Sequence, residues 1–133
     1  MRYYDYLMPS VNFFGPGCLE VIGERAKILN GKKALIVTDK FLRSLKGGAV
    51  ERSIEYLAKA GIEAVVFDQV EPNPKDVNVY AGAKVYKENN CDMIITIGGG
   101  SPHDCGKGIG IAVTHPKDIC EYAGMRNIMH HDI

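Results

Sequence analysis

Three consecutive glycines, Gly98, Gly99 and Gly100, come directly before Ser101 and Pro102 and are the part of this chain best suited to chemistry. Serine is a preferred helix N-cap, and proline is tolerated at the first helical position because its missing N–H would have no partner there. The segment therefore predicts a tight turn that leads into a helix. Its bare backbone N–H groups and the positive end of the helix dipole favour an anion such as a phosphate. Glycine in such a turn can also serve packing alone, but three in a row indicate close approach by a ligand.

Two well-known phosphate-binding patterns do not match this stretch. The P-loop needs four residues between its glycines and a hydroxyl after its lysine, whereas five residues separate Gly100 from Gly106. In addition, Gly108 follows Lys107 where the P-loop needs serine or threonine. The dinucleotide fingerprint G-x-G-x-x-G finds His103 in place of its third glycine. The turn is therefore predicted to bind phosphate or pyrophosphate, but as neither of these two motifs.

The elements that must position this turn alternate along the chain. Short apolar runs predict strands, and apolar residues at a spacing of three or four predict helices between them. The strands are expected at residues 11–14, 34–38, 63–68 and 93–97, and the helices at residues 18–29, 48–60, 75–89 and 101–113. Such alternation predicts an α/β fold, a Rossmann-like parallel sheet with right-handed crossovers and helices on both faces. The run at 93–97, just before the glycines, is expected to be a strand buried on both faces.

Length and composition limit the alternatives. The 133 residues are expected to form one domain, and the formal net charge of zero gives no basic stripe for nucleic acid. No run of 18 apolar residues is present to cross a membrane, and the first residues lack the apolar segment of a signal peptide, so a cytoplasmic protein is expected. Four cysteines without C-x-x-C spacing predict reduced, mostly buried thiols: Cys18, Cys91, Cys105 and Cys120.

Two polar residues follow the other predicted strands. In parallel sheets, ligands bind in the crevice outside the carboxyl ends of the strands, where the glycine turn also lies. Asp39 comes after the strand at 34–38 and could accept hydrogen bonds from a ribose diol, which would disfavour the 2′-phosphate of an NADP-type cofactor. Asp39 is also compatible with an ordinary turn. Asn73, held between two prolines, could read an adenine or ribose edge or could simply form the turn.

Other polar residues give weaker signals. Asp104 and Lys107 are three residues apart, so they can pair across one helical turn, or either could face a phosphate or the nicotinamide ribose. His130 and His131 stand beside Asp132 and resemble a metal-binding composition. Adjacent side chains point in different directions, and no ligand spacing supports a metal site there.

Four segments together carry a resemblance to a known family. They are YLMPSVNFFGPG at residues 6–17, IVTDK at 36–40, VEPNPKD at 70–76 and GGGSPHDCGKGIGI at 98–111. In this order they resemble the N-terminal domain of the iron-containing (group III) alcohol dehydrogenases, and within that family the 1,3-propanediol and methanol dehydrogenases. The likeness covers roughly residues 5–124, and the glycine–serine–proline–x–aspartate motif is its most specific part.

The resemblance implies a Rossmann-like domain that binds NAD. By motif match, Asp39 would hold the adenosine ribose and select NAD over NADP, and Asn73 would lie along the adenosine side. Residues 99–101 would cradle the pyrophosphate, with Gly98 in the same turn. Asp104 would lie near the nicotinamide end.

The family members continue for more than twice this length, with a threonine-rich segment that completes the cofactor site. A helical domain then supplies an aspartate and three histidines to Fe²⁺ or another divalent metal. The chain is therefore expected to be truncated, with no catalytic residue and no metal ligand of its own. The resemblance implies the NAD-binding half of an enzyme that interconverts small primary alcohols and aldehydes, inactive by itself.

Three further expectations follow. An unpaired N-terminal strand and apolar surface intended for a missing domain suggest a homo-oligomer. The alternative function is a standalone, non-catalytic nucleotide-binding module. Non-redox chemistry, as in the related dehydroquinate synthases, is disfavoured by the GGGSPHD form of the glycine motif.

Overall fold

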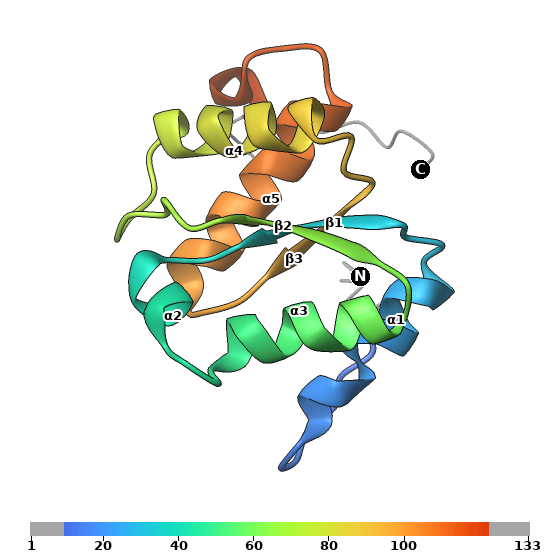
Figure 1. Ribbon diagram of the computed structural model, residues 1–133. Helices are drawn as coiled ribbons and strands as arrows, with labels where there is room; N and C mark the ends of the chain where they lie inside the picture. Colours follow the sequence, from blue (N-terminus) through green and yellow to red (C-terminus); the bar gives the residue numbers. More distant parts are fainter. Residues whose placement is uncertain (1–9, 123–133) are drawn as a thin grey trace, which may run out of the picture.

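A parallel sheet of three strands forms the centre of the computed structural model, which describes residues 10–122 (Figure 1). The strands are β1 (Lys33–Val37), β2 (Glu63–Phe67) and β3 (Met93–Thr96), in the order β2–β1–β3. Leu35 in the middle strand is paired with Val65 of β2 and Ile94 of β3. The three carboxyl ends therefore meet at one edge of the sheet.

Helices cover both faces of this sheet. In Figure 1, α4 (Asp76–Glu88) and α5 (Gly100–Thr114) lie on one face, and α1 (Ile22–Ile28) and α3 (Ala49–Lys59) lie on the other. The remaining elements are short: the 3₁₀ helices η1 (Cys18–Val21) and η2 (Ile119–Tyr122), and the helix α2 (Lys40–Ser44). The predicted Rossmann-like α/β fold is confirmed.

The side chains of β1 alternate between two apolar cores. Leu35 and Val37 pack with residues of α4 and α5, whereas Ala34 and Ile36 pack with residues of α1 and α3. All four are fully buried. A strand buried on both faces needs apolar residues at every position, which explains the continuous run in this part of the sequence.

Two expectations about the elements were wrong, and a third was right only in part. Residues 11–14 form no strand, although their composition suits one. Residues 93–97 were expected to be buried on both faces, but they are only half-buried because β3 is an edge strand of the described sheet. The helix expected at 18–29 begins instead as the 3₁₀ helix η1 and becomes α-helical at Ile22.

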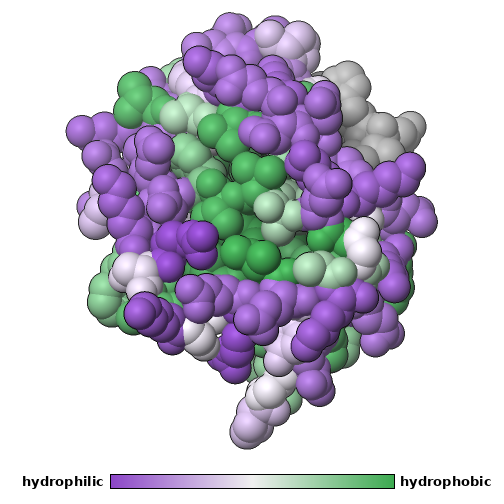
Figure 2. Space-filling view, viewed as in Figure 1, coloured by the Kyte–Doolittle hydropathy of each residue, from purple (hydrophilic) through white to green (hydrophobic). Residues whose placement is uncertain are grey.

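The other edge of the described sheet is partly apolar. Figure 2 shows apolar side chains gathered in the middle of the molecule, where β2 crosses between α3 and α4 in Figure 1. Ala64, Val65 and Val66 of β2 remain partly exposed there. Polar surfaces of the two helices border this area.

One buried hydroxyl in α3 gives a stability prediction. Ser53 is fully buried, and its Oγ has no hydrogen-bond partner within the described residues. Ser53→Ala removes this desolvated group and favours the helix, so the free energy of unfolding is expected to rise by about 1 kcal/mol. Urea denaturation would measure the change, with Arg52→Ala on the exposed side of α3 as control. A lower stability of Ser53→Ala would show that the hydroxyl has a stabilising role.

Candidate functional site

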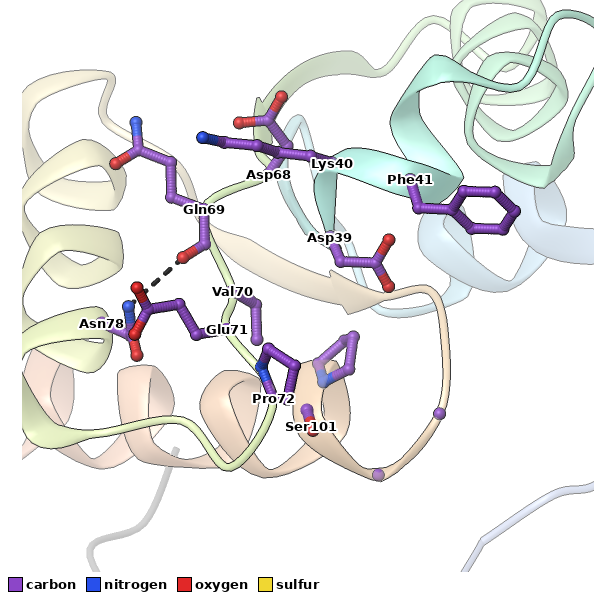
Figure 3. Close-up of a pocket in the computed structure, with 13 residues that line it drawn as sticks. Asp39, Lys40, Phe41, Asp68, Gln69, Val70, Glu71, Pro72, Asn78 and Ser101 are labelled. Atoms are coloured by element: carbon purple, nitrogen blue, oxygen red, sulfur yellow. Dashed lines mark hydrogen bonds between the residues drawn. The ribbon is translucent and has the colours of Figure 1, made fainter.

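A cleft of about 650 Å³ opens at the carboxyl ends of the three strands (Figure 3). This volume lies within the range of roughly 300–1,000 Å³ that is usual for small-molecule sites. Loops after all three strands contribute to its walls. The lining residues are Asp39, Lys40, Phe41, Asp68, Gln69, Val70, Glu71, Pro72, Asn78, Gly99, Gly100, Ser101 and Pro102.

Thr38 holds the three strand ends together beneath the cleft. Its N–H donates to the carbonyl of Phe67 at 2.9 Å, and its Oγ1 donates to the carbonyl of Ile97 at 2.9 Å. Thr38 itself is fully buried, and its bond to Ile97 is partly buried. The two bonds place the residue after β1, which is Asp39, beside the glycine turn that follows β3.

The glycine turn is open on the side of the cleft. A Cβ atom added at Gly99 or at Gly100 would meet nothing within 4 Å. Gly98 differs, because its φ of 142° is a conformation that side chains disfavour and an added Cβ would lie 2.7 Å from Cγ of Pro102. A bulky group such as a phosphate can therefore approach the backbone at Gly99 and Gly100, while Gly98 shapes the bend.

The start of α5 corrects the prediction that Ser101 is the N-cap. The helix begins at Gly100, its N-cap is Gly99, and no side chain caps it. Pro102 is then the third helical residue, where its missing N–H still costs no helical hydrogen bond. The N–H groups of Gly100 and Ser101 belong to the first turn and have no acceptor inside the helix. Backbone donors therefore face the cleft without a competing serine side chain at the cap.

Asp39 is both part of the cleft and the N-cap of α2. Its Oδ1 accepts a hydrogen bond from the N–H of Leu42 at 2.8 Å. The carboxylate is half-buried and lines the cleft. A carboxylate can accept several hydrogen bonds, so capping leaves acceptor capacity for a ligand. The turn role and the ligand role considered from the sequence are thus compatible.

The predicted site residues do not all meet in the cleft. Asp39 and residues 99–101 line it together, whereas Gly98, Asn73 and Asp104 are not among its lining residues. Asn73 is exposed and has a left-handed φ of 53° in the loop between its prolines. Asp104 is exposed and pairs with Nζ of Lys107 at 3.2 Å, which is the helical pairing expected from their spacing.

The cleft also contains Asn78, which was not singled out from the sequence. Its Oδ1 accepts from the N–H of Lys75 at 3.0 Å, and its Nδ2 donates to the carbonyl of Gln69 at 3.2 Å, the dashed line in Figure 3. Asn78 is buried, and it ties the loop after β2 to the start of α4. An asparagine three residues after Lys75, where a helix was expected to begin, was the available signal, because a polar residue at the third helical position reaches back to the N-cap.

Charge is unevenly distributed around the cleft. The loops after β1 and β2 place Asp39, Asp68 and Glu71 in its wall, with Lys40 as the one basic residue among its lining residues. In Figure 3 the Lys40 side chain turns toward Asp68. The glycine turn and the start of α5 contribute no acidic residue to the lining. A ligand with a phosphate at the glycine end and hydroxyls at the acidic end matches this distribution.

Other reactive groups near the site have structural partners. Cys105 of α5 is fully buried, and burial raises the pKa of its thiol, which keeps it protonated and a poor nucleophile. His103 is exposed, and its Nδ1 lies 2.5 Å from Oγ1 of Thr96. All four cysteines are free thiols, as expected, although only Cys91 and Cys105 are buried.

Residues 10–122 contain neither a group of metal-ligating side chains nor a membrane-spanning helix. Within them, no three His, Cys, Asp or Glu side chains are grouped to hold a metal ion. No helix in the same part of the chain has the length and apolar character needed to cross a lipid bilayer. His130 and His131 lie outside the described residues.

Comparison with known proteins identifies close relatives of this sequence. The sequence profile of the iron-containing alcohol dehydrogenases matches residues 9–132. The 1,3-propanediol dehydrogenase of Citrobacter freundii is 60% identical over 127 residues, which are 96% of this chain and 33% of that protein. The NAD-dependent methanol dehydrogenase of Bacillus methanolicus is 36% identical over 93% of this chain and 32% of its own.

The fold agrees with the sequence comparison. The crystal structure of a 1,3-propanediol oxidoreductase superposes with a TM-score of 0.92 at 57% identity, covering 97% of this chain and 33% of that one. The chain thus spans about a third of the length of the relatives that it matches.

Proposed function

The chain belongs to the iron-containing alcohol dehydrogenase family, and from this premise we propose that it is the NAD-binding part of an enzyme that interconverts alcohols and aldehydes. NAD would supply the redox chemistry by accepting a hydride from the alcohol. The residues of this chain would bind the dinucleotide and fix its orientation. The observation that carries the proposal is the open backbone at Gly99 and Gly100, in one cleft with Asp39.

The proposed binding mode follows the cleft from one end to the other. The N–H groups at residues 99–101 would donate to the diphosphate, supported by the positive end of the α5 dipole. The free oxygen of Asp39 would accept from the ribose diol on the adenosine side. Gly98 would hold the bend, and Asn73 and Asp104 would lie at the two outer ends of the dinucleotide.

Iron does not fit the residues described here, because they form no group of metal-ligating side chains. No step that involves the metal is therefore assigned to them. We propose small primary alcohols, such as propane-1,3-diol, as substrates of the whole enzyme, since the relatives named above act on 1,3-propanediol and methanol. We also propose that residues 1–133 are a single N-terminal domain and that this chain alone does not turn over.

A standalone nucleotide-binding module is not favoured, because the profile and the relatives are those of dehydrogenases. The four free cysteines support the proposal that the protein works in a reducing compartment such as the cytoplasm. The partly exposed apolar residues of β2 support the proposal that the chain self-associates.

Titration of the purified chain with NAD tests the proposed function. Weak but saturable binding is expected, with a dissociation constant above about 100 μM, because one rim of a cleft supplies only part of the contacts that a whole site would. Isothermal titration calorimetry or saturation-transfer NMR would measure it. Binding of ADP with similar affinity would localise the contacts to the adenosine–diphosphate half. A folded chain that binds neither NAD nor ADP at millimolar concentrations would contradict the proposal.

A further inference from the structure

We propose that the Phe41 ring is the platform on which the adenine base of the dinucleotide stacks. The inference rests on the proposed nucleotide-binding function and adds a residue that would recognise the base. Phe41 lines the cleft while 70% of its surface remains exposed. A large aromatic side chain exposed at the mouth of a cleft loses favourable burial unless something covers it.

The backbone position of Phe41 is set by the same residue that would read the ribose. Asp39 caps α2 through the N–H of Leu42, and its carbonyl accepts from the N–H of Arg43 at 3.0 Å. Phe41 is the second residue of this capped helix, so its backbone has a defined place relative to the Asp39 carboxylate. Figure 3 shows the Asp39 carboxylate and the Phe41 ring projecting to the same side, whereas Lys40 turns the other way.

The order of groups in a nucleotide matches the order of residues along the cleft. In a nucleoside diphosphate, the ribose lies between the phosphates and the base. With the diphosphate at Gly99 and Gly100 and the ribose diol at Asp39, the base lies beyond the carboxylate, on the side of Phe41. Stacking uses the flat face of the base and needs no hydrogen-bond partner, which suits a ring that offers none.

Charge in the same part of the cleft favours a neutral base at this position. The Asp39 carboxylate, which projects to the same side as the Phe41 ring in Figure 3, would repel a further phosphate group there. Adenine is uncharged at neutral pH and has the extended π-face that stacking requires. An adenine base therefore fits the Phe41 end better than a second anionic group does.

A single tryptophan provides a direct test, because the chain contains none. In Phe41→Trp, titration with ADP is expected to quench the indole fluorescence as the base stacks on it, while inorganic pyrophosphate leaves it unchanged. Phe14→Trp is the matched control, since Phe14 is 91% exposed and is not among the cleft-lining residues. Phe41→Ala is expected to weaken ADP binding about tenfold and to leave pyrophosphate binding unaltered. Circular dichroism should show the same fold in each variant.

The outcomes separate this inference from the proposed function. Should the wild-type chain bind ADP while Phe41→Ala binds it equally well and Phe41→Trp shows no quenching, the role of Phe41 is refuted and nucleotide binding stands. Equal quenching in Phe14→Trp and Phe41→Trp would also refute it, because the signal would then not come from the cleft. Absence of ADP binding by the folded wild-type chain would overturn both the role of Phe41 and the proposed nucleotide-binding function.

Discussion

Replacing Gly99 with leucine is expected to lower the affinity of the chain for NAD at least about 100-fold, so that no binding is detected at millimolar NAD, without unfolding the chain. The reason is the open space at this residue, where an added Cβ meets nothing within 4 Å. A leucine side chain there would occupy the approach of the diphosphate to the backbone N–H groups. Loss of two hydrogen bonds to a charged group, at about 1.5–3 kcal/mol each, accounts for a change of this size. Calorimetric titration with NAD would measure the affinity, and a thermal melt would show whether the variant remains folded.

Gly98→Ala is the matched control, because it should lower the stability of the fold, which Gly99→Leu should leave unchanged. The φ of 142° disfavours any side chain, and the added Cβ would lie 2.7 Å from Pro102 Cγ and 3.2 Å from Leu42 Cδ1. The strain is expected to cost about 2 kcal/mol or more and to lower the melting temperature by roughly 5–10 °C. If Gly99→Leu keeps the NAD affinity of the wild type, the diphosphate does not bind at this turn.

The strands could be predicted to within about one residue because their signals are local. Residues 34–38, 63–68 and 93–97 are short apolar runs, and each has a glycine within three residues of one of its two boundaries. The observed strands end at Val37, Phe67 and Thr96. Parallel topology then followed from alternation with helices, and it placed Asp39 and the glycine turn at the same edge of the sheet.

The details that were missed depend on contacts between distant residues or on very short elements. Helix α2 has five residues, too few for an apolar periodicity, and forms where Asp39 caps it. The bond from Thr38 to the carbonyl of Ile97 joins residues 59 apart in the sequence. Residues 11–14 show the converse, because a strand composition forms no strand without a neighbouring strand to pair with.

The same reasoning explains the error at the start of α5. Serine and proline at 101 and 102 are strong helix-start signals, and they predicted the N-cap at Ser101. The helix extends two residues further back, so that Gly99 is the cap. Extended backbone at Gly99, with φ −86° and ψ −153°, satisfies the cap conformation without a side chain. The consequence is a turn made only of backbone where a phosphate would bind.

Asp39→Ala is expected to weaken NAD binding about 10- to 100-fold, because the alanine can accept no hydrogen bond from the ribose diol. The same change removes the bond from Oδ1 to the N–H of Leu42, and loss of an N-cap costs about 1 kcal/mol of stability. A weaker affinity in this variant alone could therefore come from a displaced α2. A second variant is needed to separate the two effects.

Asp39→Asn separates them, since asparagine caps helices about as well as aspartate but carries no charge. If the carboxylate binds the ribose, Asp39→Asn should keep the melting temperature of the wild type and still bind NAD about tenfold more weakly. The wild-type chain should also bind NAD in preference to NADP, because the 2′-phosphate would meet the negative charge of Asp39. Equal affinity for the two cofactors would remove the ribose role from Asp39 and leave it as a helix cap.

The preference for NAD over NADP should fall in Asp39→Asn because of the charges that remain in the wall of the cleft. Removing the negative charge of Asp39 removes its repulsion of a 2′-phosphate, while Lys40, the one basic residue among the lining residues, still attracts that group. Asp68 and Glu71 remain, and their charges should keep the gain for NADP modest, at roughly threefold. Parallel titrations of NAD and NADP at low and high salt would measure the shift. Because electrostatic selection is screened by ions, the discrimination of the wild type should narrow at high salt, whereas a purely steric selection would persist.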